Sequence, residues 1–267
     1  HAVPCPINFH LLRLGMFNLE ATLFCGQAFG WKKENSTYQA VLDNRLITLD
    51  QENPFSTITK DPYLNHYFDM EYPYAEAESV LQKKDSHLAS LITAHVSIHI
   101  LNQDPFQTMI SFITSQNNTI KRIRSLLEKL SQQCGREVEE GLYSFPTADE
   151  LLRHAGEDTL RSLGFGYRSP YIIEAARSHN LLEEVARQDD EESARTLQRI
   201  LGIGAKVAAC ILLFGFGRKD VFPLDTWTKK IMKKYYPTSE PSFFSPYGGI
   251  AQQHLFYHER QMIEAHW

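Results

Sequence analysis

Hydrophobic residues follow two different spacings along the 267-residue chain. In the first third, the segments 29–31, 38–42 and 46–49 are short apolar or alternating runs, which are typical of β-strands. Asp43-Asn44 separates the last two runs and predicts a tight hairpin turn. From about Ala75 onward, hydrophobic residues recur every three or four positions, which predicts helices. Strands first and helices after indicate an α+β fold.

Local sequence signals predict where several helices begin. Asp104-Pro105 precedes an apolar helix over residues 106–114, and Asn118 or Thr119 can cap the amphipathic helix that follows. Thr147 and Glu150 have the spacing of a capping box, which predicts another helix start. Further helices are predicted over residues 171–179, 191–201 and 250–263.

The composition is that of an ordinary soluble globular protein. Hydrophobic residues make up 43% of the chain and charged residues 22%. Because no apolar run approaches roughly 18 residues, we expect no transmembrane helix and no membrane partner. A chain of this length can hold one large domain or two smaller ones, each with its own core.

The four cysteines and the paired histidines do not predict a metal site. The cysteines lie far apart, which favours reduced thiols in an intracellular compartment; they are Cys5, Cys25, Cys134 and Cys210. His95 and His99, like His254 and His258, have the i, i+4 spacing of helical metal ligands. Neither pair has a third ligand nearby in sequence, so we expect no metal and no other cofactor.

Positive charge is concentrated in one part of the chain. The net charge is −5, but residues 199–234 carry eight basic and two acidic side chains, +6, which leaves −11 for the rest. The basic residues are Arg199, Lys206, Arg218, Lys219, Lys229, Lys230, Lys233 and Lys234. Such local charge suits a phosphate backbone, although a solvated helix face would have the same pattern.

A glycine-containing turn, Leu201-Gly202-Ile203-Gly204-Ala205-Lys206, lies within this basic segment. Its two glycines let backbone N–H groups approach an anion such as a DNA phosphate. By itself, the turn is as consistent with a plain connection between two helices. Lys206 begins an almost wholly apolar helix, where poor solvation makes an amine easier to deprotonate and thus nucleophilic. The alternative is that its ammonium extends to solvent.

Asp225 follows Lys206 by nineteen residues, directly after Pro223-Leu224. A carboxylate here can stabilise positive charge that develops on a substrate. It can also cap the amphipathic segment that follows, and the two roles are compatible. An anion-binding turn, an amine and a carboxylate together favour nucleophilic chemistry on the sugar of a nucleic acid.

Four further segments make the chain resemble a known family. They are Gly-Gln-Ala-Phe-Gly-Trp at 26–31, Ser-Gln-Asn-Asn at 115–118, Leu-Gly-Phe-Gly-Tyr-Arg at 163–168 and Ala-Gln-Gln-His-Leu-Phe at 251–256. With the turn, Lys206 and Asp225, they are similar to the 8-oxoguanine DNA glycosylases from about residue 4 to residue 256. The resemblance implies an amino-terminal antiparallel sheet domain, which we assign to residues 1–95. It also implies a helical region of two subdomains at 96–267, with a helix–hairpin–helix at about 193–214.

The resemblance implies a role for each matching residue at the reaction centre. Lys206 would be the nucleophile at the sugar C1′, and Asp225 the carboxylate that supports it. In the base pocket, Gly26 would accept a hydrogen bond from the N7–H of the oxidised base. Cys210 and Phe256 would enclose the everted base, and Gln252 would contact its Watson–Crick edge. Taken alone, Cys210 and Phe256 are also consistent with ordinary core residues.

The remaining matches imply contacts to duplex DNA. Asn117 would occupy the space left by the everted nucleotide, Tyr167 would wedge the base stack, and Arg122 and Arg168 would contact the orphaned cytosine. Gly202 and Gly204 would face a DNA phosphate. The family's activity would be excision of 8-oxoguanine paired with cytosine, followed by lyase cleavage. The expected protein is a monomer that binds double-stranded DNA in an intracellular compartment, the cytoplasm or nucleoid of a bacterium or the nucleus of a eukaryote.

Four residues depart from the family pattern, and two other functions are alternatives to the one that the resemblance implies. Leu201 stands where the family often has proline, and Trp227 where well-known members have histidine near a phosphate. The segment Ser-Gln-Asn-Asn at 115–118 resembles the family's Asn-rich loop, which Gln116 and Thr119 vary. A monofunctional alkylpurine glycosylase would keep the aspartate but lack a lysine such as Lys206. A non-catalytic helix–hairpin–helix module would need only the turn and the basic residues. The absence of a cysteine cluster argues against the iron–sulfur branches of the superfamily.

Overall fold

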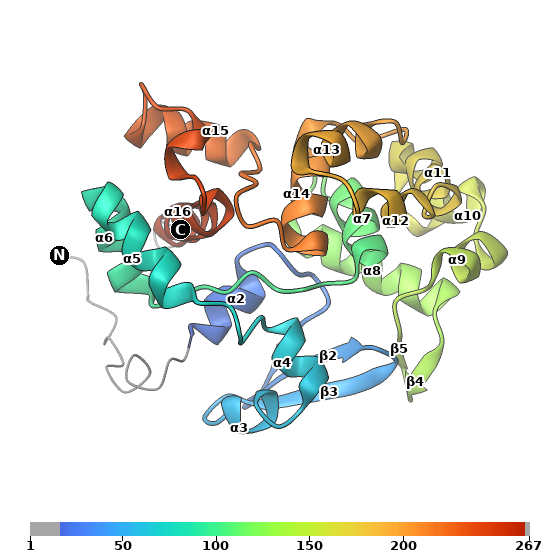
Figure 1. Ribbon diagram of the computed structural model, residues 1–267. Coiled ribbons are helices and arrows are strands. Elements are labelled where there is room, and N and C mark those ends of the chain that lie inside the picture. The colour runs from blue at the N-terminus through green and yellow to red at the C-terminus, as the bar shows by residue number, and fades with distance from the viewer. Residues whose placement is uncertain (1–16, 265–267) are drawn as a thin grey trace.

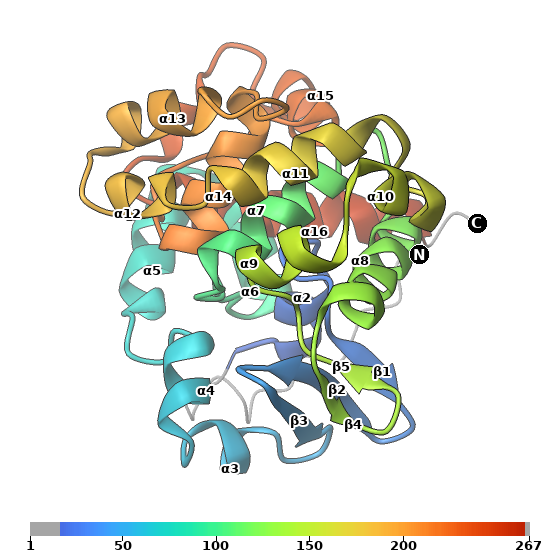
Figure 2. The same cartoon turned by 90° about the vertical axis from the view of Figure 1, so that its right-hand side faces the viewer.

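The structure is a computed structural model and describes residues 17–264, so Cys5 lies outside the described residues. A small sheet lies below two groups of helices (Figure 1), and a side view separates the two levels (Figure 2). The order of strands and helices confirms the expected α+β fold. Over residues 17–264, none of the helices combines the length and the apolar character needed to cross a membrane.

Three short antiparallel strands form the main sheet: β1 (Lys32–Glu34), β2 (Thr37–Leu42) and β3 (Arg45–Asp50). Asp43 and Asn44 join β2 to β3 with φ angles of 49° and 57°. Positive φ at both central residues is what a two-residue hairpin turn requires, so the predicted hairpin is confirmed.

The prediction of a strand at residues 29–31 is wrong. Strand pairing begins only at Lys32, which lies opposite Gln39. Phe29 and Trp31 are buried, and they pack in two different hydrophobic cores. The apolar character of this segment therefore reflects tertiary burial and not sheet pairing.

The sheet packs with three short helices around its own core. These are α2 (Leu19–Phe24), α3 (Phe55–Ile58) and α4 (Pro62–Tyr67). Along β2, Tyr38, Ala40 and Leu42 are buried while the residues between them are half-exposed. This alternation is expected of a strand with one face on the core.

The other elements of the described chain are mainly helical, with a second small sheet of β4 (Glu137–Glu139) and β5 (Leu142–Tyr143). The first helices are α5 (Tyr74–Lys84), α6 (Ser86–His95), α7 (Pro105–Thr114) and α8 (Ile120–Cys134). The next are α9 (Ala148–His154), α10 (Glu157–Leu163), the 3-10 helix η1 (Gly166–Arg168), α11 (Ser169–Arg177), α12 (Leu181–Val185) and α13 (Asp190–Gln198). The last are α14 (Ala205–Phe216), α15 (Thr226–Tyr235), the 3-10 helix η2 (Pro241–Phe244) and α16 (Gly248–Glu264).

Side-chain caps set several of these boundaries as predicted. Asp104 accepts a hydrogen bond from the backbone N–H of Gln107 at 2.7 Å and opens α7. Thr119 caps α8, and Thr147 with Glu150 forms the capping box of α9. The predicted helix over 191–201 ends earlier, at Gln198, because the chain turns there toward α14.

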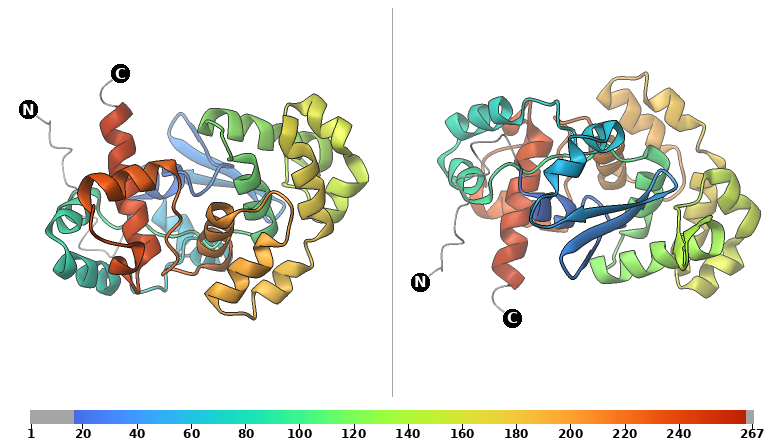
Figure 3. Two further views of the ribbon diagram at one scale, coloured as in Figure 1. Left: turned by 90° about the horizontal axis from the view of Figure 1, so that it is seen from above. Right: turned by 90° about the horizontal axis from the view of Figure 1, so that it is seen from below.

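The helices form two groups that lie side by side above the sheet (Figure 1). α6 packs against α5 and α16, and α15 packs against α16, which makes one group. The other group contains α7 to α14, and Figure 3 shows the sheet below the junction of the two. The predicted boundary at residues 95 and 96 assigns α5 and α6 to the sheet domain, although both pack in the first helical group. That boundary stays a prediction.

Helices α7 and α14 approach each other closely. Gly215 lies in α14, and a Cβ at this position would be 3.1 Å from the Cα of Pro105 and 3.3 Å from the Cβ of Thr108. The rings of Phe112 and Phe214 stack between the same two helices, 5.3 Å apart. The missing side chain at residue 215 therefore permits the close contact that the aromatic pair stabilises.

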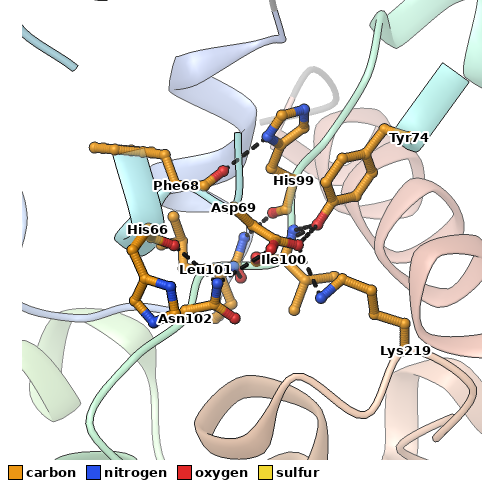
Figure 4. Close-up of polar contacts among 10 residues, drawn as sticks. His66, Phe68, Asp69, Tyr74, His99, Ile100, Leu101, Asn102 and Lys219 are labelled. Atoms are coloured by element: carbon orange, nitrogen blue, oxygen red, sulfur yellow. Dashed lines mark hydrogen bonds and ion pairs between the residues drawn. The ribbon is translucent and has the colours of Figure 1, made fainter. Parts of the chain in front are cut away.

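A buried polar junction ties the loop after α14 to the amino-terminal half (Figure 4). The Nζ atom of Lys219 lies 2.8 Å from Asp69 Oδ2, which also accepts the hydroxyl proton of Tyr74 at 2.8 Å. Asn102 donates to Asp69 Oδ1 at 3.1 Å. Burial and the charge of Asp69 raise the pKa of Tyr74, so its hydroxyl stays protonated and can donate. The junction restrains the segment that leads to Asp225.

Four histidines cluster between α6 and α16. The ring of His95 lies 6.1 Å from that of His254 and 5.6 Å from that of His258, which lies 6.3 Å from His87. His99 is elsewhere, stacked on Tyr74. Among residues 17–264, no three His, Cys, Asp or Glu side chains are grouped to hold a metal ion. Burial and, to a smaller extent, the charges of the neighbouring imidazoles of His254 and His258 lower the pKa of His95 to about 3.

This cluster should make the stability of the protein depend on pH. His95 has an ordinary pKa of 6.5 when unfolded and about 3 when folded, so the unfolded state binds its proton first. The free energy of unfolding should therefore fall below about pH 6.5, by about 1 kcal/mol from His95 between about pH 7.5 and 5.5. Urea unfolding at both pH values measures it. His95→Phe should flatten the dependence and His154→Phe, at an exposed position, should not; the same slope in all three proteins would contradict this account.

Candidate active site

One cavity of about 370 Å³ gathers the predicted reaction centre and base pocket. It is lined by Gly26, Lys206, Cys210, Asp225, Gln252 and Phe256. Gly26 follows α2, Lys206 and Cys210 lie on α14, Asp225 precedes α15, and the other two lie on α16. Two further cavities, of 360 and 630 Å³, lie beside the sheet and contain none of these residues. The candidate site therefore differs from these two cavities in the chemical groups that line it and not in its volume.

The hairpin before α14 sets the direction in which this helix enters the cavity. Gly202 has a φ of +89°, and a Cβ there would lie 2.3 Å from Cγ of Tyr171. Gly204 is extended and is the N-cap of α14. Gln116 donates to the carbonyl of Gly202 at 3.0 Å, so the Asn-rich loop is attached to the hairpin.

Lys206 and Cys210 lie one helical turn apart on α14 and both reach the cavity. Lys206 is half-buried, and its Nζ donates to Ser115 Oγ at 3.0 Å. Burial raises the pKa of the Cys210 thiol to about 12, the positive charge of Lys206 lowers it and the negative charge of Asp225 raises it. Both charges therefore act on the thiol, and Cys210 is a neutral apolar wall of the pocket.

Asp225 is the N-cap of α15, as the sequence suggests. Its Oδ1 accepts from the backbone N–H groups of Trp227 at 2.9 Å and Thr228 at 2.8 Å. The structure describes both Lys206 and Asp225, and it shows no ion pair between them. The amine contacts Ser115, while the carboxylate is held by the first turn of α15. The two groups share the cavity without touching.

A buried polar network supports the base pocket from behind. Gln253 donates to Oε1 of Gln252 at 2.7 Å, and its own Oε1 accepts from Cys25 Sγ at 2.7 Å. Gln27 donates to the carbonyl of His99 at 2.8 Å. Gln27 and Gln253 were not predicted as site residues, and the sequence points to them only through their positions directly beside Gly26 and Gln252. The network fixes the amide of Gln252 at the cavity wall.

The predicted DNA-contacting residues gather beside the cavity. Asn117 donates to the hydroxyl of Tyr167 at 3.4 Å, and Arg122 donates to the carbonyl of Gly164 at 3.3 Å. Asn117, Arg122 and Tyr167 are exposed, as residues that meet DNA need to be.

Arg168, the fourth predicted DNA-contacting residue, is buried, with 5% of its surface exposed, whereas the other three are exposed. Its guanidinium donates to the carbonyls of Gln116 and Asn117 and lies 4.4 Å from the ring centre of Tyr167. In this structure, Arg168 therefore holds the Asn-rich loop. Its contact with a cytosine stays a prediction, and that contact requires these bonds to open.

The basic segment is partly neutralised by ion pairs that the sequence did not reveal. The pairs are Arg199 with Glu184, Arg218 with Asp190, Lys219 with Asp69, and Lys234 with Glu259. Lys229, Lys230 and Lys233 remain exposed on α15. Trp227 is 42% exposed at the cavity, with the Nζ of Lys230 5.3 Å from its ring centre.

Two family models match the chain in succession. Residues 11–109 match the one described as 8-oxoguanine DNA glycosylase, N-terminal domain. Residues 110–242 match the one described as HhH-GPD superfamily base excision DNA repair protein.

Two curated relatives are similar to the chain. The N-glycosylase/DNA lyase of Saccharomyces cerevisiae is 37% identical over an alignment of 160 residues, and the match covers 53% of this chain and 43% of the yeast protein. The N-glycosylase/DNA lyase OGG1 of Arabidopsis thaliana is 28% identical over an alignment of 240 residues, and the match covers 81% of this chain and 66% of the plant protein. The chain thus spans less than two thirds of the length of either relative.

Solved structures match over most of both chains. MBOgg1, in complex with a low-affinity DNA ligand, is 33% identical with a TM-score of 0.82, and the match covers 92% of this chain and 93% of that one. The 8-oxoguanine glycosylase/lyase of Clostridium acetobutylicum, in complex with DNA containing cytosine opposite 8-oxoG, is 28% identical with a TM-score of 0.81 and the same coverage.

The hairpin geometry predicts unequal effects at its two glycines. Gly202→Ala should lower the free energy of unfolding by about 1–3 kcal/mol, because an L-residue is strained at positive φ and its Cβ would clash with Tyr171. Gly204→Ala is the control, since this glycine is extended and a Cβ there meets nothing within 4 Å; it should lose only about 0.5–1 kcal/mol, because alanine is a poorer N-cap than glycine. Urea unfolding of both variants measures the difference. Equal losses would show that the turn does not depend on residue 202.

Proposed function

The chain belongs to the 8-oxoguanine DNA glycosylases of the helix–hairpin–helix superfamily, and on this basis we propose that it is a bifunctional DNA glycosylase and AP lyase. Its proposed substrate is 8-oxoguanine paired with cytosine in duplex DNA. The names of the similar yeast, plant and C. acetobutylicum proteins support this assignment. The proposed working form is a monomer that acts on DNA inside the cell.

The main support for this function is a single cavity that contains the amine of Lys206, the carboxylate of Asp225 and the residues predicted to enclose the base. A base cannot be attacked inside the double helix, so an enzyme must evert it into such a cavity. A purely DNA-binding helix–hairpin–helix module has no need for Lys206 and Asp225 in one cavity. An alkylpurine glycosylase that lacks a nucleophilic amine has no need for Lys206.

In the proposed reaction, the neutral amine of Lys206 attacks C1′ of the everted nucleotide. The new C1′–N bond replaces the glycosidic bond, and the base leaves with the bonding electron pair and takes up a proton. The sugar ring then opens to a protonated Schiff base with Lys206. Loss of a C2′ proton and cleavage of the 3′ C–O bond by β-elimination nick the strand.

Asp225 acts through its charge in this scheme. Positive charge develops on the sugar as the glycosidic bond breaks, and a fixed carboxylate in a cavity shielded from water stabilises it strongly. The two N–H bonds from α15 hold the carboxylate before substrate arrives. Lys206 and Asp225 line the same cavity without an ion pair between them, so the carboxylate does not occupy the amine before substrate binds.

The pocket walls supply the proposed selectivity. Phe256 and the neutral thiol of Cys210 enclose the base, Gln252 contacts its Watson–Crick edge, and the Gly26 carbonyl accepts the N7–H that distinguishes 8-oxoguanine from guanine. On the DNA side, Asn117 and Tyr167 replace the everted nucleotide in the stack.

Arginine forks suit the unpaired edge of the orphaned cytosine. We assign this contact to Arg122 first, because it is exposed, and to Arg168 once the Asn-rich loop releases it. The hairpin N–H groups at Gly202 and Gly204 face a phosphate.

Lys206→Gln tests the nucleophile. We expect the rate of nicking of an 8-oxoguanine:cytosine duplex to fall by at least about 10³-fold, and the adduct trapped by borohydride to disappear, because an amide cannot form the Schiff base. Lys83→Gln, on the exposed face of α5, is the control and should behave as wild type. An adduct that persists in Lys206→Gln would remove this residue from the mechanism. Base release without any adduct in the wild type would favour a monofunctional glycosylase.

Asp225→Asn separates charge from capping. Asparagine caps a helix about as well as aspartate, so the free energy of unfolding should change little, whereas Asp225→Ala should lower it by about 1 kcal/mol. Loss of the charge should slow single-turnover base excision by about 10²-fold and leave the DNA dissociation constant nearly unchanged. If excision and binding weaken together in Asp225→Asn, the residue is only structural.

A further inference from the structure

The amine of Lys206 rests on the carboxyl end of α7. Its Nζ donates to Ser115 Oγ at 3.0 Å and lies 5.3 Å from the ring centre of Phe112. Ser115 is the C-cap of α7, and Phe112 lies one turn earlier on the same helix. One helix end thus supplies both contacts of the amine, and both residues line the cavity.

The direction of the Ser115–Lys206 hydrogen bond is fixed by a second bond. The hydroxyl of Ser115 donates its proton to the carbonyl of Phe112 at 2.7 Å. A serine hydroxyl has one proton to donate and keeps lone pairs to accept. Its oxygen can therefore only accept from Lys206, and one N–H of the amine must point at Ser115.

An amine with one N–H directed in this way has a restricted orientation. A neutral amine has two N–H bonds and one lone pair, and rotation about the bond to its last carbon otherwise moves the lone pair freely. With one N–H held by Ser115, the lone pair is confined to a few directions, and the side chain already lines the cavity. Rates of attack depend strongly on such alignment.

Asp225 does not provide this restraint. Its Oδ1 is bound by the first turn of α15, and Lys206 contacts Ser115 instead. Among the polar side chains that line the cavity, Ser115 is the one to which the amine is hydrogen-bonded. Ser115 is also the first residue of the Asn-rich loop, so its hydroxyl connects this loop to the amine of Lys206.

We propose that Ser115 is a positioning residue for the nucleophile: its hydroxyl aims the amine of Lys206 into the cavity. The inference rests on the proposed function, because it assigns Lys206 the attack on C1′. Ser115 itself touches no reacting atom, and its effect passes entirely through Lys206. The hydroxyl is needed, and the rest of the side chain is not.

The test compares Ser115→Ala with Ser115→Thr, which keeps the hydroxyl, and with Ser111→Ala, which removes another hydroxyl from α7. Single-turnover borohydride trapping is measured on two duplexes, one with 8-oxoguanine opposite cytosine and one with a preformed abasic site. We expect Ser115→Ala to slow trapping on both by about 10-fold or more, with the DNA dissociation constant unchanged within about twofold. Ser115→Thr should recover most of the rate, and Ser111→Ala should match wild type.

The abasic duplex separates this proposal from the proposed function. A wild type that traps abasic DNA but never releases 8-oxoguanine would contradict the substrate assignment and leave the comparison of serine variants valid. Trapping by Ser115→Ala at the wild-type rate on the abasic duplex would overturn the positioning role. So would a threonine variant as slow as the alanine variant, or equal losses in Ser111→Ala and Ser115→Ala, since each would point to a general effect on α7.

Discussion

The close packing of α7 against α14 is the constraint on which the candidate site depends. Gly215 leaves room for the backbone of Pro105, and the stacked rings of Phe112 and Phe214 fill the rest of the contact. Because the helices meet there, the end of α7 reaches the amine of Lys206, and the loop that follows reaches the hairpin through Gln116. A Cβ at residue 215 would require Pro105 or Thr108 to move by a few tenths of an ångström. Interiors packed this densely transmit such displacements and do not absorb them.

Polar contacts between distant segments hold the other walls of the cavity. Behind the base pocket, Cys25, Gln253 and Gln252 form a chain of hydrogen bonds that joins the end of α2 to α16. Beyond α14, Asp69 and Lys219 tie the loop that leads to Asp225 to the amino-terminal half. A buried polar group without a partner is costly, so such networks are stable in one arrangement only. The walls of the site therefore come from segments that are distant in the sequence. Hydrogen bonds and an ion pair between these segments hold them in place.

Local features of this fold were predictable from the sequence, whereas features that depend on distant partners were not. Helix caps depend only on the next few residues, and the Asp43-Asn44 hairpin depends only on its own backbone. The hairpin, the capping box of Thr147, the cap at Asp225 and a helix start after Asp104-Pro105 were therefore predicted. The sequence left the next cap open between Asn118 and Thr119, and the structure shows Thr119. The strand expected at 29–31 failed because its hydrophobic residues serve tertiary burial. The residues of the cavity were identified by family resemblance, but their mutual geometry was not, since Lys206 meets Ser115 across 91 positions of sequence. The burial of Arg168 and the pairing of half the basic segment were likewise invisible, because a sequence does not show which charges neutralise each other.

The burial of Cys25, Cys134 and Cys210 has a consequence for chemical damage. Peroxides and alkylating agents react with the thiolate and hardly with the thiol. Burial raises the pKa of Cys25 and Cys210 to about 12 and that of Cys134 to about 11. At neutral pH these thiols therefore stay protonated. The sulfur beside Lys206 thus reacts slowly with reagents that need a thiolate, and the pocket keeps an unmodified apolar wall where such reagents are present.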